Sequence, residues 1–270
     1  MPLARVDDIS LHYVVEGEGP PLLMIMGFGG QHHSWGEPTC RLLARHFRTI
    51  RFDNRGTGLS DKPEVEYSIA MMADDAAGLL RSLSIGKAHV YGVSMGGMIA
   101  QELALRHPDL VAGLVLGCTT PGWAHGVAPE PHIIQMMMPE PGLSREEQVR
   151  KSWPALCTPR FLEEGHDFLE EMLRLGLQNP TPIETLNRQA AAIQRFDTYD
   201  RLDRIRAPTL IVHGDQDVLV PTRNAYILHE RIPGSRLAII EGAGHVYFWE
   251  KPAEAARLVI EFLAQVSLGA

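Results

Sequence analysis

The amino-acid sequence predicts an α/β fold in which helices cover both faces of a mostly parallel sheet and a mostly helical cap is inserted. Two observations predict this fold. Short apolar runs alternate with segments of helical periodicity in residues 1–120 and again in 201–270, which is typical of a parallel sheet buried on both faces. Residues 121–200 contain no convincing strand and many prolines, which interrupt helices. We therefore assign residues 1–120 and 201–270 to one core and residues 121–200 to a cap.

The first part of the core supplies most of the expected strands. Polar and apolar residues alternate in Ile9–Glu16, as in a strand with one exposed face, whereas Leu22–Met26 is apolar throughout, as in a fully buried strand. Apolar residues at helical spacing in 69–84 predict a helix. In chain order, the expected elements are a strand at 9–16, a strand at 22–26, a helix at 38–46, a strand at 47–53, a helix at 69–84, a strand at 88–93, a helix at 95–107 and a strand at 110–117.

The alternation resumes after the cap. The apolar run in residues 207–217 predicts a strand, and a helix is expected near 222–232. A strand at 235–242 and a helix at 252–266 complete the chain. Ligands of such sheets bind beyond the carboxyl ends of the strands, so the residues that follow each strand are the candidates for function.

The composition argues against several classes of partner and location. The 270 residues carry a net charge of −8 and contain no Lys/Arg run, so we expect no nucleic-acid binding. No stretch reaches the about 18 apolar residues of a membrane span, and the N-terminal segment lacks the apolar region of a signal peptide. The cysteines at positions 40, 118 and 157 are odd in number and widely spaced, which favours free buried thiols. We therefore expect a cytoplasmic protein with no membrane partner.

One serine stands at the joint between the fourth predicted strand and the helix that follows it. Gly92 and Gly96 flank Ser94 in a G-x-S-x-G pattern, which in a strand–turn–helix context is typical of a nucleophile elbow. The tight turn would lift the Ser94 hydroxyl above the sheet and leave the backbone N–H of Met95 at the positive end of the helix. A simpler alternative is that Ser94 only caps this helix.

A serine nucleophile needs a general base, and the base needs a group that orients it. Two carboxylates, Asp215 and Asp217, follow the predicted strand at 207–217, and the glycine-flanked His245 follows the last strand. Because all of these residues lie after strands of one parallel sheet, we expect Ser94, one carboxylate and His245 to converge at one edge.

Several motifs resemble those of the α/β-hydrolase superfamily, in its capped esterase, lactonase and C–C hydrolase branch. The resemblance covers most of the chain and is weakest in the cap. It rests on the segments MGFGG (26–30), FDNRGTGLSDKP (52–63), YGVSMGGMIAQELALRHPDLVAGLVL (91–116), VHGDQDVLVP (212–221) and GAGHVYFWEKP (242–252). The resemblance implies an eight-stranded α/β-hydrolase sheet.

The same resemblance implies a catalytic triad of Ser94 as nucleophile, His245 as general base and Asp217 as the orienting acid. Asp217 fits the family's Gly-x-x-Asp pattern; in the alternative, Asp215 is the acid and Asp217 only forms the turn. The implied oxyanion hole consists of the backbone N–H groups of Phe28 and Met95, which would hold the negative charge that develops in acyl transfer.

The implied reaction is the hydrolysis of a carboxylic ester or lactone through an acyl-enzyme, with a small-molecule substrate and neither cofactor nor metal. Two alternatives use the same triad: C–C bond hydrolysis of a dienoate-type diketone and cofactor-free perhydrolysis. The first needs a cation for the substrate carboxylate, which Arg188 or Arg195 of the cap could supply. An alternative of another class is a ligand receptor that barely turns over. The oligomeric state is not predicted.

Aromatic and methionine side chains predict an apolar pocket between cap and core. The candidates for its wall are Trp35, Trp123, Met137 and Trp153. The alternative interpretation is that the methionines of the cap only pack it against the core.

Two pairs of polar residues lie after predicted strands, and for each pair a structural role is preferred over a functional one. His32 and His33 follow the first buried strand and could face the substrate pocket, but residues of a surface loop or of the wall are the preferred interpretation. Neither has a metal-ligand partner at a suitable sequence spacing, so we expect no metal site. Asp53 and Arg55 could form a charged pair, but a strand-end turn held by local hydrogen bonds is the preferred interpretation.

Overall fold

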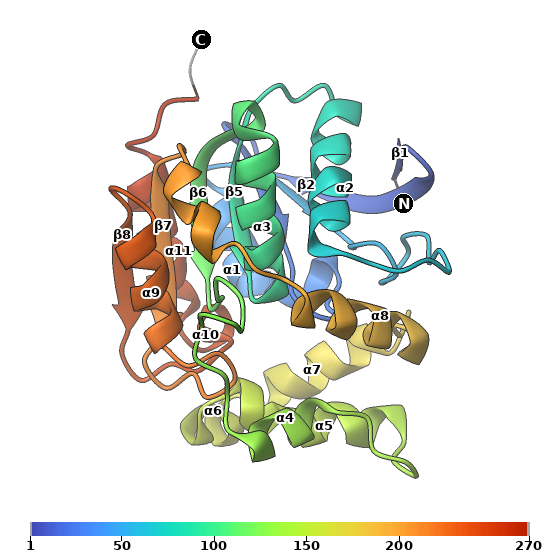
Figure 1. Ribbon diagram of the computed structural model, residues 1–270. Coiled ribbons are helices and arrows are strands. Elements are labelled where there is room, and N and C mark those ends of the chain that lie inside the picture. The colour runs from blue at the N-terminus through green and yellow to red at the C-terminus, as the bar shows by residue number, and fades with distance from the viewer. Residues whose placement is uncertain (1, 269–270) are drawn as a thin grey trace.

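The computed structural model describes residues 2–268, which contain an eight-stranded sheet (Figure 1). Its strand order is β1-β2-β4-β3-β5-β6-β7-β8, and the pairs of β2 are antiparallel whereas those from β4 to β8 are parallel. The predicted, mostly parallel sheet is thereby confirmed. The strands are β1 (Leu3–Val6), β2 (Ile9–Glu16), β3 (Pro21–Ile25), β4 (Arg48–Phe52), β5 (Ala88–Val93), β6 (Val111–Gly117), β7 (Thr209–Gly214) and β8 (Arg236–Ile240).

Strand β1 is a strand that the sequence analysis missed, as it also missed the short helix at Tyr247–Glu250. Its four residues, LARV, are too few for an alternating pattern to stand out. It forms the edge of the sheet through an antiparallel pair with β2, in which Val6 lies opposite Ile9.

Helices cover both faces of the sheet, and β3 shows why its residues are apolar throughout. Leu22 and Met24 pack with residues of α1 and α11, whereas Leu23 and Ile25 pack with residues of α2, α3 and α9. Successive side chains of a strand point to opposite faces, so each face of β3 is buried in its own apolar layer. The helices of these layers are α1 (Glu37–Ala44), α2 (Ile69–Ser82), α3 (Met95–Arg106), α9 (Arg223–Arg231) and α11 (Pro252–Leu263), and the short α10 (Tyr247–Glu250) precedes α11.

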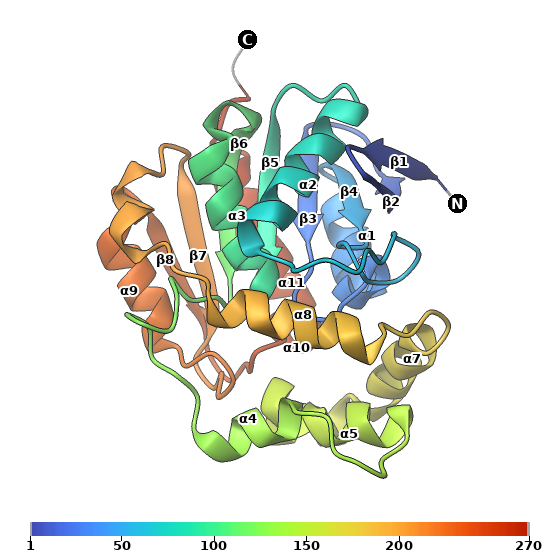
Figure 2. The same ribbon diagram turned by 45° about the vertical axis from the view of Figure 1, so that its right-hand side comes forward.

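The chain between β6 and β7 is helical and lies beside one end of the sheet in both views (Figures 1 and 2). We call residues 121–200 the inserted segment. Its two ends lie together, because Gly122 and Asp197 form an isolated antiparallel bridge and the Thr198 N–H donates to the Pro121 carbonyl over 2.8 Å. Its helices are α4 (Pro131–Met137), α5 (Arg145–Leu156), α6 (Pro159–Glu164), α7 (His166–Gly176) and α8 (Ile183–Gln194).

Short 3₁₀ turns complete the secondary structure at His32–Trp35, Pro108–Leu110 and Tyr199–Arg204. Cys40, Cys118 and Cys157 are buried and free, as predicted. Within residues 2–268, none of the helices has the length and apolar character that crossing a bilayer requires.

Candidate active site

Ser94 stands on a sharply bent backbone between β5 and α3. Its φ is 56° and its ψ −124°, a conformation that residues other than glycine rarely adopt. Two glycines permit the bend, because a Cβ on Gly92 would lie 2.2 Å from the Gly96 carbonyl oxygen and one on Gly96 would lie 2.0 Å from that of Ile25. Between residues 88 and 104, Ser94 alone is not buried. The backbone therefore presents this one hydroxyl at the end of a buried strand.

The alternative that Ser94 only caps α3 has no support in the hydrogen bonds. The Ser94 side chain accepts none from the first turn of the helix. Its hydroxyl instead lies beside the loop that follows β3, since a Cβ on Gly27 would be 3.4 Å from Ser94 Oγ.

A buried aspartate, Asp217, orients a histidine at the same edge of the sheet. The Nδ1 of His245 lies 2.8 Å from Asp217 Oδ2, and the Nε2 of His213 lies 3.0 Å from the same oxygen. The other oxygen, Oδ1, accepts the backbone N–H groups of Leu219 and Val220 over 2.9 and 2.8 Å. Asp217 thus holds His245 through a carboxylate that three further contacts fix in place.

Electrostatics keep Asp217 ionised. Burial alone would raise its pKa, but the charge of His245 and hydrogen bonds from His213 and His245 hold the pKa well below its ordinary value. An ionised carboxylate beside Nδ1 favours the tautomer of His245 with a proton on Nδ1, which leaves Nε2 as the basic nitrogen.

The neighbouring Asp215 has a different contact. Its Oδ1 accepts the backbone N–H of Gly242 over 2.7 Å, and its side chain is exposed. Asp215 therefore ties the loop before His245 to the end of β7, and of the two aspartates it is Asp217 that contacts the histidine.

Ser94 and His245 lie in the wall of one cavity of about 270 Å³. The loop after β3, the inserted segment and the start of α10 enclose the rest of it. Its walls are mostly apolar, and none of the residues that form them is an aspartate or glutamate. The lining residues beyond Ser94 and His245 include Phe28, Gln31, Met137, Arg145, Val149, Trp153, Leu156, Met172, Leu173, Leu186, Leu219, Phe248 and Trp249.

The two backbone N–H groups predicted to form the oxyanion hole, one in the cavity wall and one directly after Ser94, have no acceptor in the described part of the chain. Met95 is the first residue of α3, where N–H groups have no partner inside the helix. Neither the N–H of Met95 nor that of Phe28 donates a hydrogen bond within residues 2–268. The loop that carries Phe28 is held from the inserted segment, because the Gly29 N–H donates to Gln189 Oε1 over 2.9 Å and the Gly29 carbonyl accepts Thr181 Oγ1.

A second possible nucleophile at the cavity, Cys118, has the wrong environment for the role. It follows β6 and is buried. Burial, and next the charge of Asp217, raise the pKa of its thiol, so the reactive thiolate is disfavoured.

The four residues predicted for the pocket wall fall into two groups. Met137 and Trp153 line the cavity. Trp35 does not: it is fully buried and packs between Tyr91 and Phe248, with ring centroids at 4.8 and 5.3 Å. Trp123 is half-buried against the apolar layer of α2 and α3 and is not part of the cavity wall either. A sequence pattern of aromatic residues does not tell these two environments apart.

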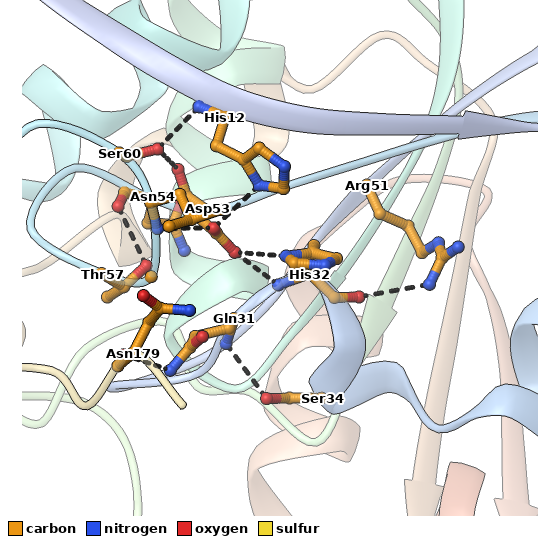
Figure 3. Close-up of polar contacts among 12 residues, drawn as sticks. His12, Gln31, His32, Ser34, Arg51, Asp53, Asn54, Thr57, Ser60 and Asn179 are labelled. Carbon is orange, nitrogen blue, oxygen red and sulfur yellow. Dashed lines mark hydrogen bonds and ion pairs between the residues drawn. The ribbon is translucent and has the colours of Figure 1, made fainter. Parts of the chain in front are cut away.

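The predicted interpretation of His32 needs correction, because the fold gives this residue partners that are distant in sequence. His32 Nδ1 lies 2.9 Å from Asp53 Oδ1, and His12 Nδ1 lies 3.0 Å from Asp53 Oδ2 (Figure 3). Asp53 also accepts the backbone N–H groups of His32 and Leu59. Burial opposes ionisation, but these hydrogen bonds, with that of the His32 side chain first, lower the pKa of Asp53.

The ligand atoms of His12, His32 and Asp53 lie within 4.8 Å of one another, so a metal ion could in principle bind them. Hydrogen bonds already explain the cluster, however. A metal on Nδ1 of His12 would force the proton to Nε2, which is buried without an acceptor. The alternative of a charged pair between Asp53 and Arg55 is absent, since Arg55 forms a two-pronged ion pair with Asp75 over 2.5 and 2.6 Å. The preferred strand-end turn is present, with the Leu59 N–H donating to Asp53 Oδ2 and the Ser60 hydroxyl donating to the Asp53 carbonyl.

Sequence reasoning missed one charged residue of the cavity, Arg145 in the first turn of α5. The two arginines that it proposed lie elsewhere: Arg195 pairs with Glu66 over 2.6 Å, and Arg188 does not line the cavity. The spacing of residues 145, 148, 149, 152, 153 and 156 on one face of a helix was a signal that could have found it.

The chain has extensive similarity to known hydrolases. A family model described as "alpha/beta hydrolase fold" matches residues 20–152 and 171–252. A protein of Azorhizobium caulinodans named "Putative carbamate hydrolase RutD" is 30% identical, over 98% of this chain and 99% of its own length. The enol-lactonase from Burkholderia xenovorans LB400 is 25% identical with a TM-score of 0.86, and the match covers 98% of this chain and 100% of that structure. A thermophilic esterase from Thermogutta terrifontis is 27% identical with a TM-score of 0.82 and covers 98% of each chain.

Proposed function

This chain belongs to the alpha/beta hydrolase family, and we propose that it is a serine hydrolase that cleaves a carboxylic ester or lactone through an acyl-enzyme. One observation carries the proposal. A strained serine and a histidine that is held by a buried, ionised aspartate lie in the wall of the same mostly apolar cavity. Nucleophile, base and orienting acid are the groups that acyl transfer to water requires.

The proposed reaction starts with the attack of Ser94 Oγ on the carbonyl carbon of the substrate. His245 takes the hydroxyl proton and then gives it to the departing alcohol, while Asp217 stays ionised and stabilises the imidazolium. The N–H groups of Phe28 and Met95 hold the oxyanion in both tetrahedral intermediates. A water molecule, activated by the same histidine, then hydrolyses the acyl-enzyme and releases the acid.

We propose that the inserted segment acts as a cap that closes the substrate cavity. Its helices supply Met137, Trp153 and Leu186 to the wall, and backbone contacts join it to the catalytic loops. The Val246 N–H, next to His245, donates to the Leu156 carbonyl over 3.2 Å. Changes in this segment would therefore alter substrate choice more than the chemistry.

Carbamate hydrolysis is a second candidate, because the name of the Azorhizobium caulinodans relative states that substrate class and the similarity covers nearly the whole of both chains. A carbamate presents the same carbonyl carbon to Ser94, and the same oxyanion donors would serve. C–C hydrolysis and a receptor role remain as alternatives, and the experiment below separates the first by its substrate and the second by the absence of turnover. Perhydrolysis is a further alternative that uses the same triad.

The test is a panel of p-nitrophenyl esters of increasing acyl length, with lactones, carbamates and ring-fission dienoates, on the purified protein. The proposal predicts turnover of esters or lactones and a loss of kcat of on the order of 10⁶-fold in Ser94→Ala. Ser82→Ala, on the exposed side of α2, is the matched control and should retain full activity. Full activity of Ser94→Ala, or turnover of dienoates alone, would contradict the proposal.

A further inference from the structure

Helix α5 of the inserted segment lines the cavity along its whole length, with a charged residue at one end and an apolar residue at the other. The lining residues of α5 follow the helical repeat, and they include Arg145 at its first residue and Leu156 at its last. Because an α-helix rises 1.5 Å per residue, these two ends lie roughly 16 Å apart along the axis. The Leu156 end adjoins His245 through the hydrogen bond from Val246, so Arg145 marks a part of the cavity remote from this contact.

Arg145 has no acidic partner in the protein. Within residues 2–268, no carboxylate oxygen lies within 4.0 Å of its guanidinium, and the cavity wall contains no acidic residue. The two glutamates that follow it along the chain are engaged elsewhere, since Glu146 pairs with Arg150 and Glu147 accepts the N–H of Ser144. The positive charge of Arg145 is therefore uncompensated.

The guanidinium of Arg145 also has N–H groups without an acceptor in the described residues. Its Nη2 donates to the Thr181 carbonyl over 3.2 Å, and the other N–H groups have no hydrogen-bond partner within the described residues. Arg145 is half-buried, and this burial lowers its pKa, as expected when a cation leaves water without gaining a carboxylate. Arg150, on the same helix, is instead paired with Glu146 and Glu170.

Helix stability does not explain the residue. Ser144 and Glu147 form a capping box that starts α5, so the helix begins without help from Arg145. A cation in the first turn is disfavoured by the helix dipole, which prefers negative charge at that end. An unpaired, half-buried cation at a helix start in an apolar cavity fits a partner that comes with the substrate.

We propose that the substrate carries a carboxylate at the end remote from the scissile bond and that Arg145 binds it. The inference rests on the proposed hydrolase function and names its substrate class: an ester or lactone of a dicarboxylic or related acid. A carboxylate matches the planar fork of an arginine with two parallel hydrogen bonds. One arginine in an otherwise uncharged wall suits a single negative charge.

The experiment compares substrates that differ only at this end. The p-nitrophenyl monoesters of adipic and suberic acid carry a terminal carboxylate, and p-nitrophenyl hexanoate and octanoate carry a methyl group in its place. We expect a higher kcat/KM for the carboxylates of at least one length in the natural protein. In Arg145→Gln, kcat/KM for that carboxylate should fall by about 10- to 100-fold, while the value for the methyl ester stays nearly constant.

Two variants separate recognition from folding. Arg145→Lys keeps the charge and should retain part of the preference, and Arg150→Gln removes the same charge from the solvent side of α5 and should leave the preference intact. Thermal melting of each variant checks the fold. A preference for the methyl esters in the natural protein, or an equal fall for both esters in Arg145→Gln, would overturn the proposal.

The outcomes also distinguish this inference from the proposed function. If hydrolysis of the esters requires Ser94 but Arg145→Gln does not change the ratio of kcat/KM between carboxylate and methyl esters, the carboxylate site is refuted and the proposed function stands. If no ester is hydrolysed, the proposed function fails, and calorimetric binding of the adipate monoester to Ser94→Ala still decides the inference. Binding that disappears in Ser94→Ala/Arg145→Gln supports the site, and equal or absent binding in both proteins refutes it.

Discussion

Two buried clusters in this molecule have nearly the same local chemistry. In each, an aspartate accepts two backbone N–H groups and contacts two histidines: Asp217 contacts His213 and His245, and Asp53 contacts His12 and His32. Both aspartates have a side chain with no exposed surface and a lowered pKa. Composition and hydrogen bonding alone would not say which cluster does chemistry.

The difference lies in what the histidines face. His245 forms part of the wall of the cavity that contains Ser94, whereas none of His12, His32 and Asp53 does. The second cluster instead joins β2, the 3₁₀ turn at His32–Trp35 and the end of β4 (Figure 3). A histidine–aspartate pair becomes a candidate for catalysis through its access to a nucleophile and a substrate, and otherwise it fixes the chain.

The largest expected difference in kcat between the two clusters is seen when one histidine is removed from each. His245→Ala should lower kcat by on the order of 10⁶-fold, because the proposed general base is lost. His32→Ala removes an equivalent ring from the other aspartate and should change kcat far less. Steady-state kinetics on one p-nitrophenyl ester, with circular dichroism as the check on folding, measures both; equal losses would abolish the distinction.

The aspartates give the second comparison. Asp217→Asn should lower kcat by about 10⁴-fold with KM little changed, because the amide no longer selects the productive tautomer of His245. Asp53→Asn should instead lower the free energy of unfolding by about 3 kcal/mol, since it leaves buried donors unpaired. Urea denaturation and kinetics of the two variants check this. A large stability loss in Asp217→Asn with normal kcat would assign that cluster to structure.

Acid stability should show what the clusters share. Burial favours protonation, but contacts with the histidines lower the pKa of both aspartates below the 3.8 of the free group. A group whose folded pKa is depressed stabilises the protein above its unfolded pKa, and this contribution is lost as the pH falls through the folded value. The free energy of unfolding should therefore decline below about pH 4, and less steeply in either Asp→Asn variant. An unchanged decline in both variants would show that other groups cause it.

The smallest effect is expected from metal chelation. If hydrogen bonds alone hold His12, Asp53 and His32 together, excess EDTA should change neither the melting temperature nor the activity. A clear fall in melting temperature that zinc restores would show that this cluster binds a metal, and would separate the two clusters in a different way.

The sequence predicted the parts of this molecule that are encoded locally. Alternating and continuous apolar runs located the strands, and the glycines around Ser94 and His245 marked tight turns because they follow strands directly. The pattern Gly-x-x-Asp pointed to Asp217, which the structure places against His245. Its catalytic role and the function of the inserted segment stay predictions until they are measured.

What the sequence did not predict depends on residues that meet only in the folded chain. His12 and His32 reach Asp53 from separate segments, and nothing in their spacing indicates it. Arg145 was missed for a related reason: its isolation from acidic residues is a property of the fold, since two glutamates follow it directly in the sequence. Trp35 was wrongly placed on the pocket wall, because an aromatic residue after a glycine-rich loop fits the wall of a pocket and a position in the core equally well.

The most direct test of the central claim is covalent labelling with a fluorophosphonate, followed by mass-spectrometric mapping of the modified peptide. The proposed triad predicts one adduct per chain on Ser94, rapid in the natural protein, strongly slowed in His245→Ala and absent in Ser94→Ala. An adduct on another residue, or labelling of Ser94 at the same rate without His245, would contradict the assignment of these side chains to one catalytic unit.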